Sequence, residues 1–417
     1  MYQGGRVAAW HDGFNPSVIT DGVDKTKTVG ADGRASFHGF AHTEHLSILT
    51  SMLRLNREIP DLERRKIVNL SMFAAAASGK VTPDALIAEV SIREKQYLAT
   101  PKRRFRLVSS ISMSTTTRPL MLRLQRSQLC FGWKPNRSTA AIRSKLVDAA
   151  KRTIAGDLPT HYSAVSALVT ARTKHEAVAL ALDGIDLIRG IWNLWKNRAS
   201  WIRISSGART PVNAFILGPI HTLHTPDGKP VADDWWYEPS YRGPISVWSD
   251  ETRIIKMLEF ARRVRGSLLR LPYRDTVVSA LIRYARALDS REWNDSFLQL
   301  WSVIELLTGT TENESHKTTV KRAAFIYKNR DYATQALLHL RYCRNAAVHS
   351  GEGRENVEPL MYQAKNTVEA LIEFHLWHAG QFARLADAAV FLESPSSVRD
   401  IDNQIRRLEG ARKYLSR

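Results

Sequence analysis

Apolar residues recur at helical spacing through most of the C-terminal third of this 417-residue chain. A helix with one apolar face must bury that face against other elements, so a series of such helices folds as a bundle. The clearest i, i+3, i+4 pattern is Phe297, Leu300, Trp301, Ile304 and Leu307. Helices are predicted at Ser249–Leu271, Thr276–Leu288, Ser296–Leu307, Thr318–Lys328, Tyr332–Ala347 and Val357–His378.

The N-terminal half has a different pattern. Phe105–Met113 and Leu120–Leu124 alternate apolar and polar side chains, which predicts a pair of strands, and Leu129–Trp133 is a candidate third strand. Glu176–Asn197 reads as a helix that is apolar on more than one side, so it is expected to be buried between layers. The fold class predicted is mainly α: an α+β region at 1–250, a helical bundle at 251–380 and a helical tail at 381–417.

Charge is distributed unevenly along the chain, whose formal net charge is +19. Residues 274–380 carry thirteen Lys and Arg against thirteen Asp and Glu, whereas residues 102–152 carry thirteen against the single acid Asp148. The N-terminal half is therefore expected to hold a polyanion such as RNA. A generally basic surface is the alternative.

The basic block interleaves arginines and lysines with Phe131 and Trp133. Charges that pair with phosphates and rings that stack on bases suit single-stranded RNA. The other interpretation, in which the rings lie in the core and the cations on the solvated face, stays open. The candidate RNA-binding residues are Arg123, Arg126, Lys134 and Arg137.

Several functional classes lack support in the sequence. No P-loop, Gly-x-Ser-x-Gly or Cys-x-x-Cys motif is present. The two cysteines, Cys130 and Cys343, are too distant for a metal knuckle, and neither a long apolar stretch nor an apolar N-terminal segment occurs. We expect a cytoplasmic protein with no metal, no cofactor and no membrane partner.

Arg344 and His349 are the residues with the most specific chemistry. A histidine can move protons near neutral pH, and an arginine can stabilise the extra negative charge on a phosphorane. On one continuous helix the two side chains point roughly 140° apart, since each residue turns about 100°. They can act together only if the helix ends between them or if a second copy faces the first. Without that, Arg344 is an ordinary helix-end residue and His349 a surface one.

The run Arg344-Asn345-x-x-Val348-His349 resembles the Arg-x4-6-His motif of HEPN domains, in particular the ApeA-like branch of bacterial and phage-defence proteins. Phe297–Leu307, with its Trp and its Glu305-Leu306-Leu307 ending, is similar to the first helix of that family. The resemblance covers about residues 275–380. It implies a bundle of four or more helices and a dimeric ribonuclease in which the motifs of two protomers meet.

By the same resemblance, Arg344 would stabilise phosphate charge, His349 would shuttle the proton, and Asn345 would bind phosphate or orient the histidine. Glu305 is predicted to aim Arg344, with a purely structural salt bridge as the alternative. The implied activity is metal-independent endoribonuclease cleavage by the RNA 2′-OH, in a toxin or anti-phage defence effector that forms a homodimer.

Two alternatives to a ribonuclease are kept. The first is a non-catalytic HEPN scaffold that binds RNA or a partner. The second is an enzyme whose site lies in the N-terminal half, on histidines such as His221 and His224. Separately, the tail carries the heptad-like seam Val398, Ile401, Ile405 and Leu408, which predicts pairing with a second copy or docking on its own domain.

Overall fold

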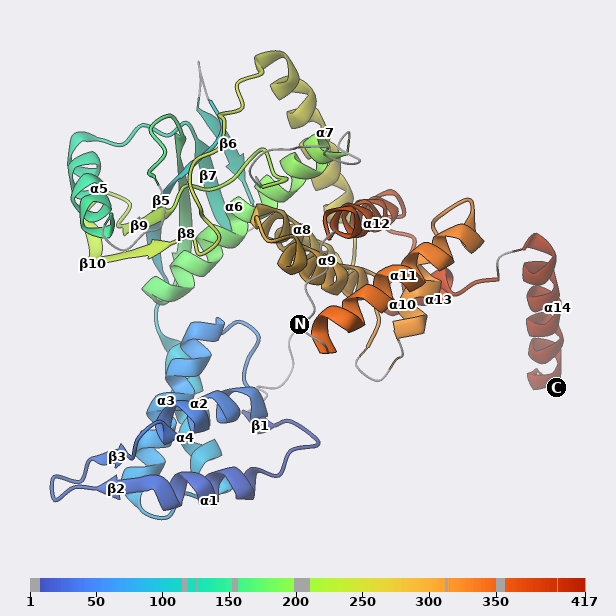
Figure 1. Cartoon of the computed structure of the whole chain (residues 1–417). Coiled ribbons are helices and arrows are strands. Elements are labelled where there is room, and N and C mark those ends of the chain that lie inside the picture. The colour runs from blue at the N-terminus through green and yellow to red at the C-terminus, as the bar shows by residue number, and fades with distance from the viewer. Residues whose placement is uncertain are drawn as a thin grey trace.

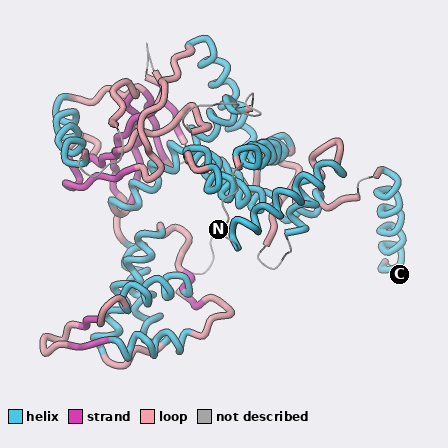
Figure 2. The backbone as a smooth tube through the Cα atoms, in the orientation of Figure 1, coloured by secondary structure: helices cyan, strands magenta, loops and turns pink. Residues whose placement is uncertain are grey.

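The computed structural model describes residues 8–114, 119–124, 126–151, 157–198, 211–311, 314, 316–349, 357–395 and 397–416. Figure 1 shows a small N-terminal unit, a sheet with its helices, and a group of helices that leads to the C-terminus. Figure 2 shows the strands gathered in the N-terminal part of the chain, the last of them ending at Tyr237. The predicted class, mainly α with an α+β N-terminal region, is confirmed.

The N-terminal unit has its own hydrophobic core, in which Leu49, Val68, Met72 and Val90 are fully buried. It is attached to the rest of the chain through polar contacts, such as the hydrogen bond that Tyr97 Oη donates to Glu176 (3.1 Å). Its elements are β1 Ala9–Trp10, α1 Pro16–Thr26, β2 Lys27–Val29, β3 Ala35–Phe37, α2 Ala41–Met52, β4 Leu53–Arg54, α3 Asp61–Ser78 and α4 Pro83–Ala99.

A six-stranded sheet follows, in the antiparallel order β10-β9-β5-β8-β7-β6. The predicted strands exist, but the first two are not a pair: β5 lies between β8 and β9, and β6 pairs with β7 at the edge. Local alternation cannot reveal such long-range pairing. The elements are β5 Arg103–Ile111, β6 Leu120–Arg123, β7 Ser127–Phe131, β8 Ser163–Ala171, β9 Ile220–His224 and β10 Pro230–Tyr237.

Two helices pack on the sheet. α6 (Lys174–Asn197) covers one face and lies between the sheet and the helical part of the chain, as its predicted burial requires. Its Trp192 is fully buried against Phe131 and Phe215, with ring centroids 4.6 and 5.6 Å away. α5 (Arg137–Ala150) contacts β9 and β10 on the opposite face. On this opposite face, the strands beyond β9, which are β5, β8, β7 and β6, carry several exposed side chains.

The helical part follows the predicted helices closely, and the apolar stripe of Phe297–Leu307 is buried. α9 packs between α8 and α12. None of the described helices is long and apolar enough to cross a membrane. The helices are α7 Glu251–Arg270, α8 Arg274–Asp289, α9 Trp293–Leu307, α10 His316–Ala324, α11 Arg330–His349, α12 Glu358–Trp377, α13 Leu385–Leu392 and α14 Val398–Leu415.

One hydrophobic core joins the sheet to the helical part, from Phe105 to Leu376. α6 and α8 approach so closely that a Cβ added to Gly190 would lie 2.4 Å from the Leu281 carbonyl oxygen. The core therefore continues across residues 250 and 251, where the sequence predicts a domain boundary. The break between separate cores falls instead near residue 100, after Tyr97.

Candidate functional site

The predicted motif lies at the C-terminal end of α11. The helix begins where the Asn329 side chain accepts a hydrogen bond from the Tyr332 N–H (3.1 Å), which satisfies a free donor of the first turn. It packs against α9 and α10. The apolar face predicted for this helix is confirmed. Its buried residues are Ala333, Leu337, Leu340 and Cys343, and Ala347 at the end of the row is half-buried.

α11 runs without a break through Arg344 and Asn345 to His349. The first of the two ways in which Arg344 and His349 could converge, a helix end between them, is therefore excluded. On this continuous helix their positions are roughly 140° apart, so convergence requires a second copy of the chain. The side chain of His349 lies outside the described residues.

Arg344 is half-buried and donates a hydrogen bond from Nη1 to Asn345 Oδ1 (3.3 Å), which brings two predicted site residues together. Within the described part of the chain, Arg344 forms no ion pair with a carboxylate. A guanidinium whose described partner is a neutral amide keeps its charge and most of its donors for a ligand.

Glu305 lies on α9, the helix that packs against α11, where it accepts a hydrogen bond from Trp301 Nε1 (2.7 Å). No ion pair between Glu305 and Arg344 is formed among the residues whose positions are described. The contact with the buried Trp301 supports a structural role for Glu305, because a buried indole N–H needs an acceptor.

Arg341 is a neighbour of the motif that the sequence reading missed. Its Nε is buried and has no hydrogen-bond partner in the described structure. Residues three apart on a helix are surface neighbours, so Arg341 lies beside Arg344. The spacing Arg-x-x-Arg on one helix is the signal that would have identified this pair. Neither guanidinium forms an ion pair with a carboxylate in the part of the chain that the structure describes, and two such adjacent cations suit an anion such as phosphate.

A second group of cations lies on the sheet face opposite α6, beyond the strands that α5 contacts. Directly opposed residues of antiparallel strands share a face, and the register aligns Arg123, Gln128, Leu168 and Arg106 across β6, β7, β8 and β5. Arg104, two residues before Arg106, points to the same side. Arg104 and Arg123 are exposed. We name Arg104, Arg106 and Arg123 the basic sheet face; the sequence reading missed the first two.

The remaining candidate RNA-binding residues border this face. Arg126 lies in the β6–β7 turn, Lys134 lies between β7 and α5, and Arg137 begins α5; all three are exposed. Phe131 is fully buried in the core, which for this ring confirms the core interpretation rather than base stacking. Trp133 is half-buried, with the Arg106 guanidinium 5.2 Å from its ring centroid.

Arg143 of α5 adds a cation at the covered end of the same face. It donates to the carbonyls of Val108 (2.8 Å) and Ile220 (3.1 Å) and to the Thr222 hydroxyl (2.8 Å), all of them neutral acceptors. Burial lowers the pKa of Arg143 to about 10 and also lowers the pKa of Arg106. Among the described residues, no carboxylate forms an ion pair with the basic sheet face or with Arg143. Unpaired positive charge of this kind attracts a polyanion.

His221 and His224, the residues of the N-terminal enzyme alternative, are buried in β9. His221 is hydrogen-bonded to Ser109 (2.8 Å) and His224 to Thr222 (2.9 Å). Burial lowers the pKa of His224. Across the described ranges, no group of three or more His, Cys, Asp or Glu side chains is arranged to hold a metal ion. His221 Nε2 also lies 3.6 Å from Glu238 Oε2. Both imidazoles are 0% exposed, however, which does not favour a site that is open to a substrate.

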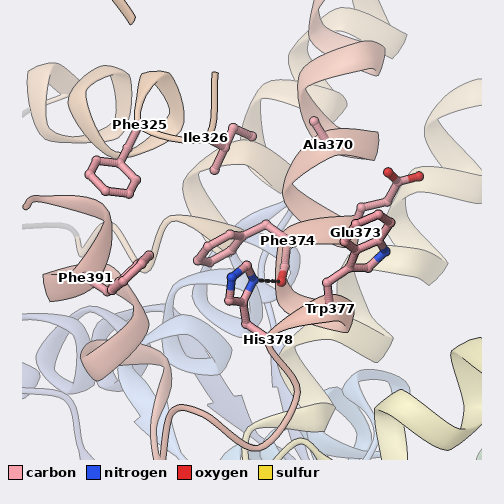
Figure 3. A pocket seen from close by; sticks show the side chains of 8 residues that line it. All are labelled: Phe325, Ile326, Ala370, Glu373, Phe374, Trp377, His378 and Phe391. Carbon is pink, nitrogen blue, oxygen red and sulfur yellow. Dashed lines mark hydrogen bonds between the residues drawn. The ribbon is translucent and has the colours of Figure 1, made fainter. Parts of the chain in front are cut away.

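An open pocket of about 440 Å³ lies between α12, α13 and the end of α10. Figure 3 shows its wall of rings, Phe325, Phe374, Trp377 and Phe391, with His378 hydrogen-bonded to the Phe374 carbonyl (2.8 Å). Glu373 at its edge forms an ion pair with Arg198 (2.5 Å). The pocket contains none of the predicted site residues.

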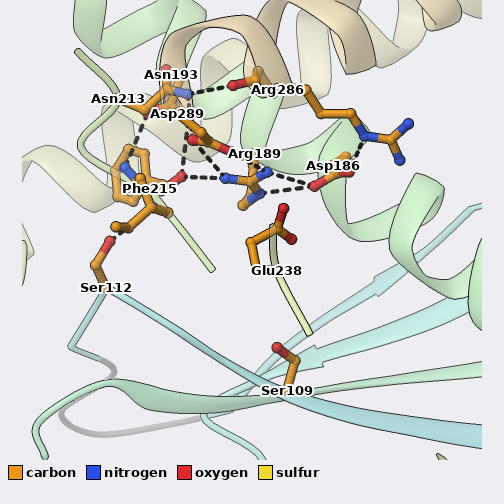
Figure 4. Close-up of polar contacts among 12 residues, drawn as sticks. Ser109, Ser112, Asp186, Arg189, Asn193, Asn213, Phe215, Glu238, Arg286 and Asp289 are labelled. Carbon is orange, nitrogen blue, oxygen red and sulfur yellow. Dashed lines mark hydrogen bonds and ion pairs between the residues drawn. The ribbon is translucent and has the colours of Figure 1, made fainter. Parts of the chain in front are cut away.

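The most highly connected polar cluster is internal and joins α6 to α8 (Figure 4). Arg189 is 1% exposed and donates to Asp186 (2.6 Å), to both carboxylate oxygens of Asp289 (2.9 and 3.1 Å) and to the Phe215 carbonyl (3.0 Å). Asn213 also donates to Asp289 (2.7 Å). Burial raises the pKa of Asp289 to about 6, although Arg189 opposes that shift. All five donors of Arg189 are used, so we name this structural cluster the Arg189 junction.

Comparison of the chain with protein-family models, with curated proteins and with solved structures finds no match. The likeness to HEPN domains therefore rests on residues 297–307 and 344–349 alone.

Proposed function

We propose that this chain is a metal-independent endoribonuclease of the HEPN type, with an active site formed by the α11 ends of two copies. The observation that carries the proposal is the combination of an unbroken α11 with an Arg344 that pairs with no carboxylate among the described residues. A continuous helix separates Arg344 from His349 within one copy, and a symmetric second copy removes that separation.

In the proposed reaction, one His349 takes the proton from a ribose 2′-OH, and the 2′-oxygen attacks the adjacent phosphorus. Arg344, assisted by Arg341, stabilises the additional negative charge on the phosphorane. The bond from phosphorus to the 5′-oxygen breaks, and that oxygen takes up the proton that the same His349 received from the 2′-OH. The products are a 2′,3′-cyclic phosphate and a 5′-hydroxyl.

The test is RNA cleavage in excess EDTA. We expect His349→Ala to reduce the rate about 10²–10⁴-fold and Arg344→Ala about 10²–10³-fold. The matched control is Arg283→Ala, which removes an exposed arginine of α8. Undiminished cleavage by the His349→Ala/Arg344→Ala double variant, or intact RNA with the unaltered protein, would refute the catalytic assignment.

Mixing the two inactive variants tests the two-copy site directly. A mixed dimer of Arg344→Ala and His349→Ala chains retains one arginine and one histidine, on different copies. If the site is composite, partial activity returns on mixing, whereas each variant alone stays inactive. Failure to recover activity in a verified mixed dimer would contradict a site shared between copies.

A non-catalytic RNA-binding scaffold is the second candidate, and the basic sheet face is the observation that favours it. It predicts strongly salt-dependent RNA binding that His349→Ala leaves unchanged, with no cleavage under any condition. We further propose a cytoplasmic toxin or anti-phage role. Growth arrest on expression of the unaltered chain, absent with His349→Ala, would support that role and also separate the two candidates.

A further inference from the structure

The C-terminal helix α14 shows an apolar face that the rest of the chain does not cover. Ser397 caps it by accepting a hydrogen bond from the Asp400 N–H (3.1 Å), so the helix begins with its own local signal. No α14 side chain is buried; Val398, Leu408 and Leu415 are 75%, 62% and 84% exposed. Figure 1 shows α14 standing apart from the other helices.

The apolar positions of α14 have the spacing of a two-helix interface. The row alternates three and four residues apart, which places it along one side of the helix as the a and d positions of heptads. One charged residue interrupts it near the C-terminal end. The row is Val398, Ile401, Ile405, Leu408, Arg412 and Leu415.

The charges decide the orientation. In a parallel pair, Arg412 would face Arg412 of the other copy within the seam, and two like charges would be desolvated together. In an antiparallel pair centred between Ile405 and Leu408, Arg412 instead faces Ile401 of the other copy and lies beside its Asp402. Neither Asp402 nor Arg412 has an ion-pair partner in the described chain, so both charges are available for this contact.

We propose that α14 pairs antiparallel with α14 of a second copy of this chain, about a two-fold axis between Ile405 and Leu408. The pairing is self-complementary: Val398 packs on Leu415, Ile401 on Arg412 and Ile405 on Leu408, each twice. It brings together the two copies that the proposed site requires, but its test uses neither RNA nor activity.

Sedimentation of the full chain tests the pairing. We expect the unaltered protein to dimerise, and Leu408→Asp to weaken dimerisation at least tenfold. Asn403→Asp, which adds the same charge on the outer side of α14, should have no such effect. Because no α14 side chain is buried, both variants keep the rest of the fold. A monomeric unaltered chain would overturn the proposal, whether α14 then packs on its own chain or binds a different protein. A Leu408→Asp variant that dimerises normally would also overturn it.

Disulfide cross-linking tests the orientation, because both native cysteines are buried. Val398 and Leu415 are about 25 Å apart along the helix. A Val398→Cys chain mixed with a Leu415→Cys chain should form mixed disulfide dimers, while Val398→Cys alone should form few. The reverse result would establish a parallel pair and refute the antiparallel one. A monomeric Leu408→Asp variant that still cleaves RNA would contradict the two-copy active site while leaving the α14 pairing intact.

Discussion

The Arg189 junction and the end of α11 both centre on an arginine, and they differ in what surrounds it. Arg189 is almost fully buried, and its donors are distributed over Asp186, Asp289 and a backbone carbonyl. Arg344 is half-buried, and its described contact is one neutral amide, that of Asn345. The first arginine has all its donors satisfied by its own chain, whereas the second donates one hydrogen bond among the described residues.

This difference separates a structural charge from one that is available to a ligand. A buried ion pair is costly to break because the remaining partner stays charged without compensation. An arginine that faces no carboxylate contributes little to folding and keeps its charge for an anion. The contrast predicts that substitution affects a different property at each arginine. Substitution of Arg189 should lower the stability of the fold, and substitution of Arg344 should lower activity.

The largest expected effect is on folding. Arg189→Met leaves Asp289 buried without its cation and Asp186 with Arg286 as its remaining cation, so we expect a loss of about 3–5 kcal/mol in the free energy of unfolding. Arg344→Met should change it by less than about 0.5 kcal/mol. Urea unfolding of both variants measures the difference. An equal loss of unfolding free energy in the two variants would contradict the proposed difference between the Arg189 junction and the end of α11.

The second effect concerns pH and extends the comparison to histidines. His375 of α12 is fully buried; its Nε2–H donates to the Leu307 carbonyl at the end of α9 (2.9 Å), and its Nδ1 accepts from the hydroxyl of Tyr273, just before α8 (3.0 Å). Burial lowers the pKa of His375 to about 4. Below about pH 6.5 the unfolded chain binds a proton that the folded chain does not, so folding stability is fully present above that pH and is lost as the pH falls toward 4.

The loss should reach about 3 kcal/mol, since one pKa unit corresponds to about 1.4 kcal/mol. Urea unfolding at neutral pH and in mild acid measures it. His375→Gln, which keeps a donor for Leu307, should remove most of this pH dependence. An unchanged slope in the variant would show that other groups cause it.

The smallest effect is on RNA affinity. Arg104→Gln with Arg123→Gln should weaken binding of single-stranded RNA, because each lost phosphate contact reduces the salt dependence of log K by about 0.7. Fluorescence anisotropy at several salt concentrations measures the slope. Arg283→Gln on α8 is the matched control. If the control lowers the slope as much, net charge rather than the basic sheet face governs binding.

Local pattern was sufficient for much of the fold. The stripe of Phe297–Leu307, the inward row of α11 and the buried helix near Glu176–Asn197 all follow from helical spacing of apolar residues, which depends only on neighbours in sequence. The strands were also predictable as elements. Their order was not: β5 pairs with β8 and β9 rather than with β6, and such contacts depend on chain segments far apart.

The candidate site divides in the same way. The sequence by itself determined the residue types at the end of α11, the charge excess of residues 102–152 and the seam of α14, because spacing and composition are properties of the chain. Only the tertiary structure decided that Phe131 is buried, that Glu305 contacts Trp301, and that Arg189 pairs with two carboxylates while Arg344 pairs with none among the described residues. The physical reason is that partners and solvent exposure depend on which distant segments pack together.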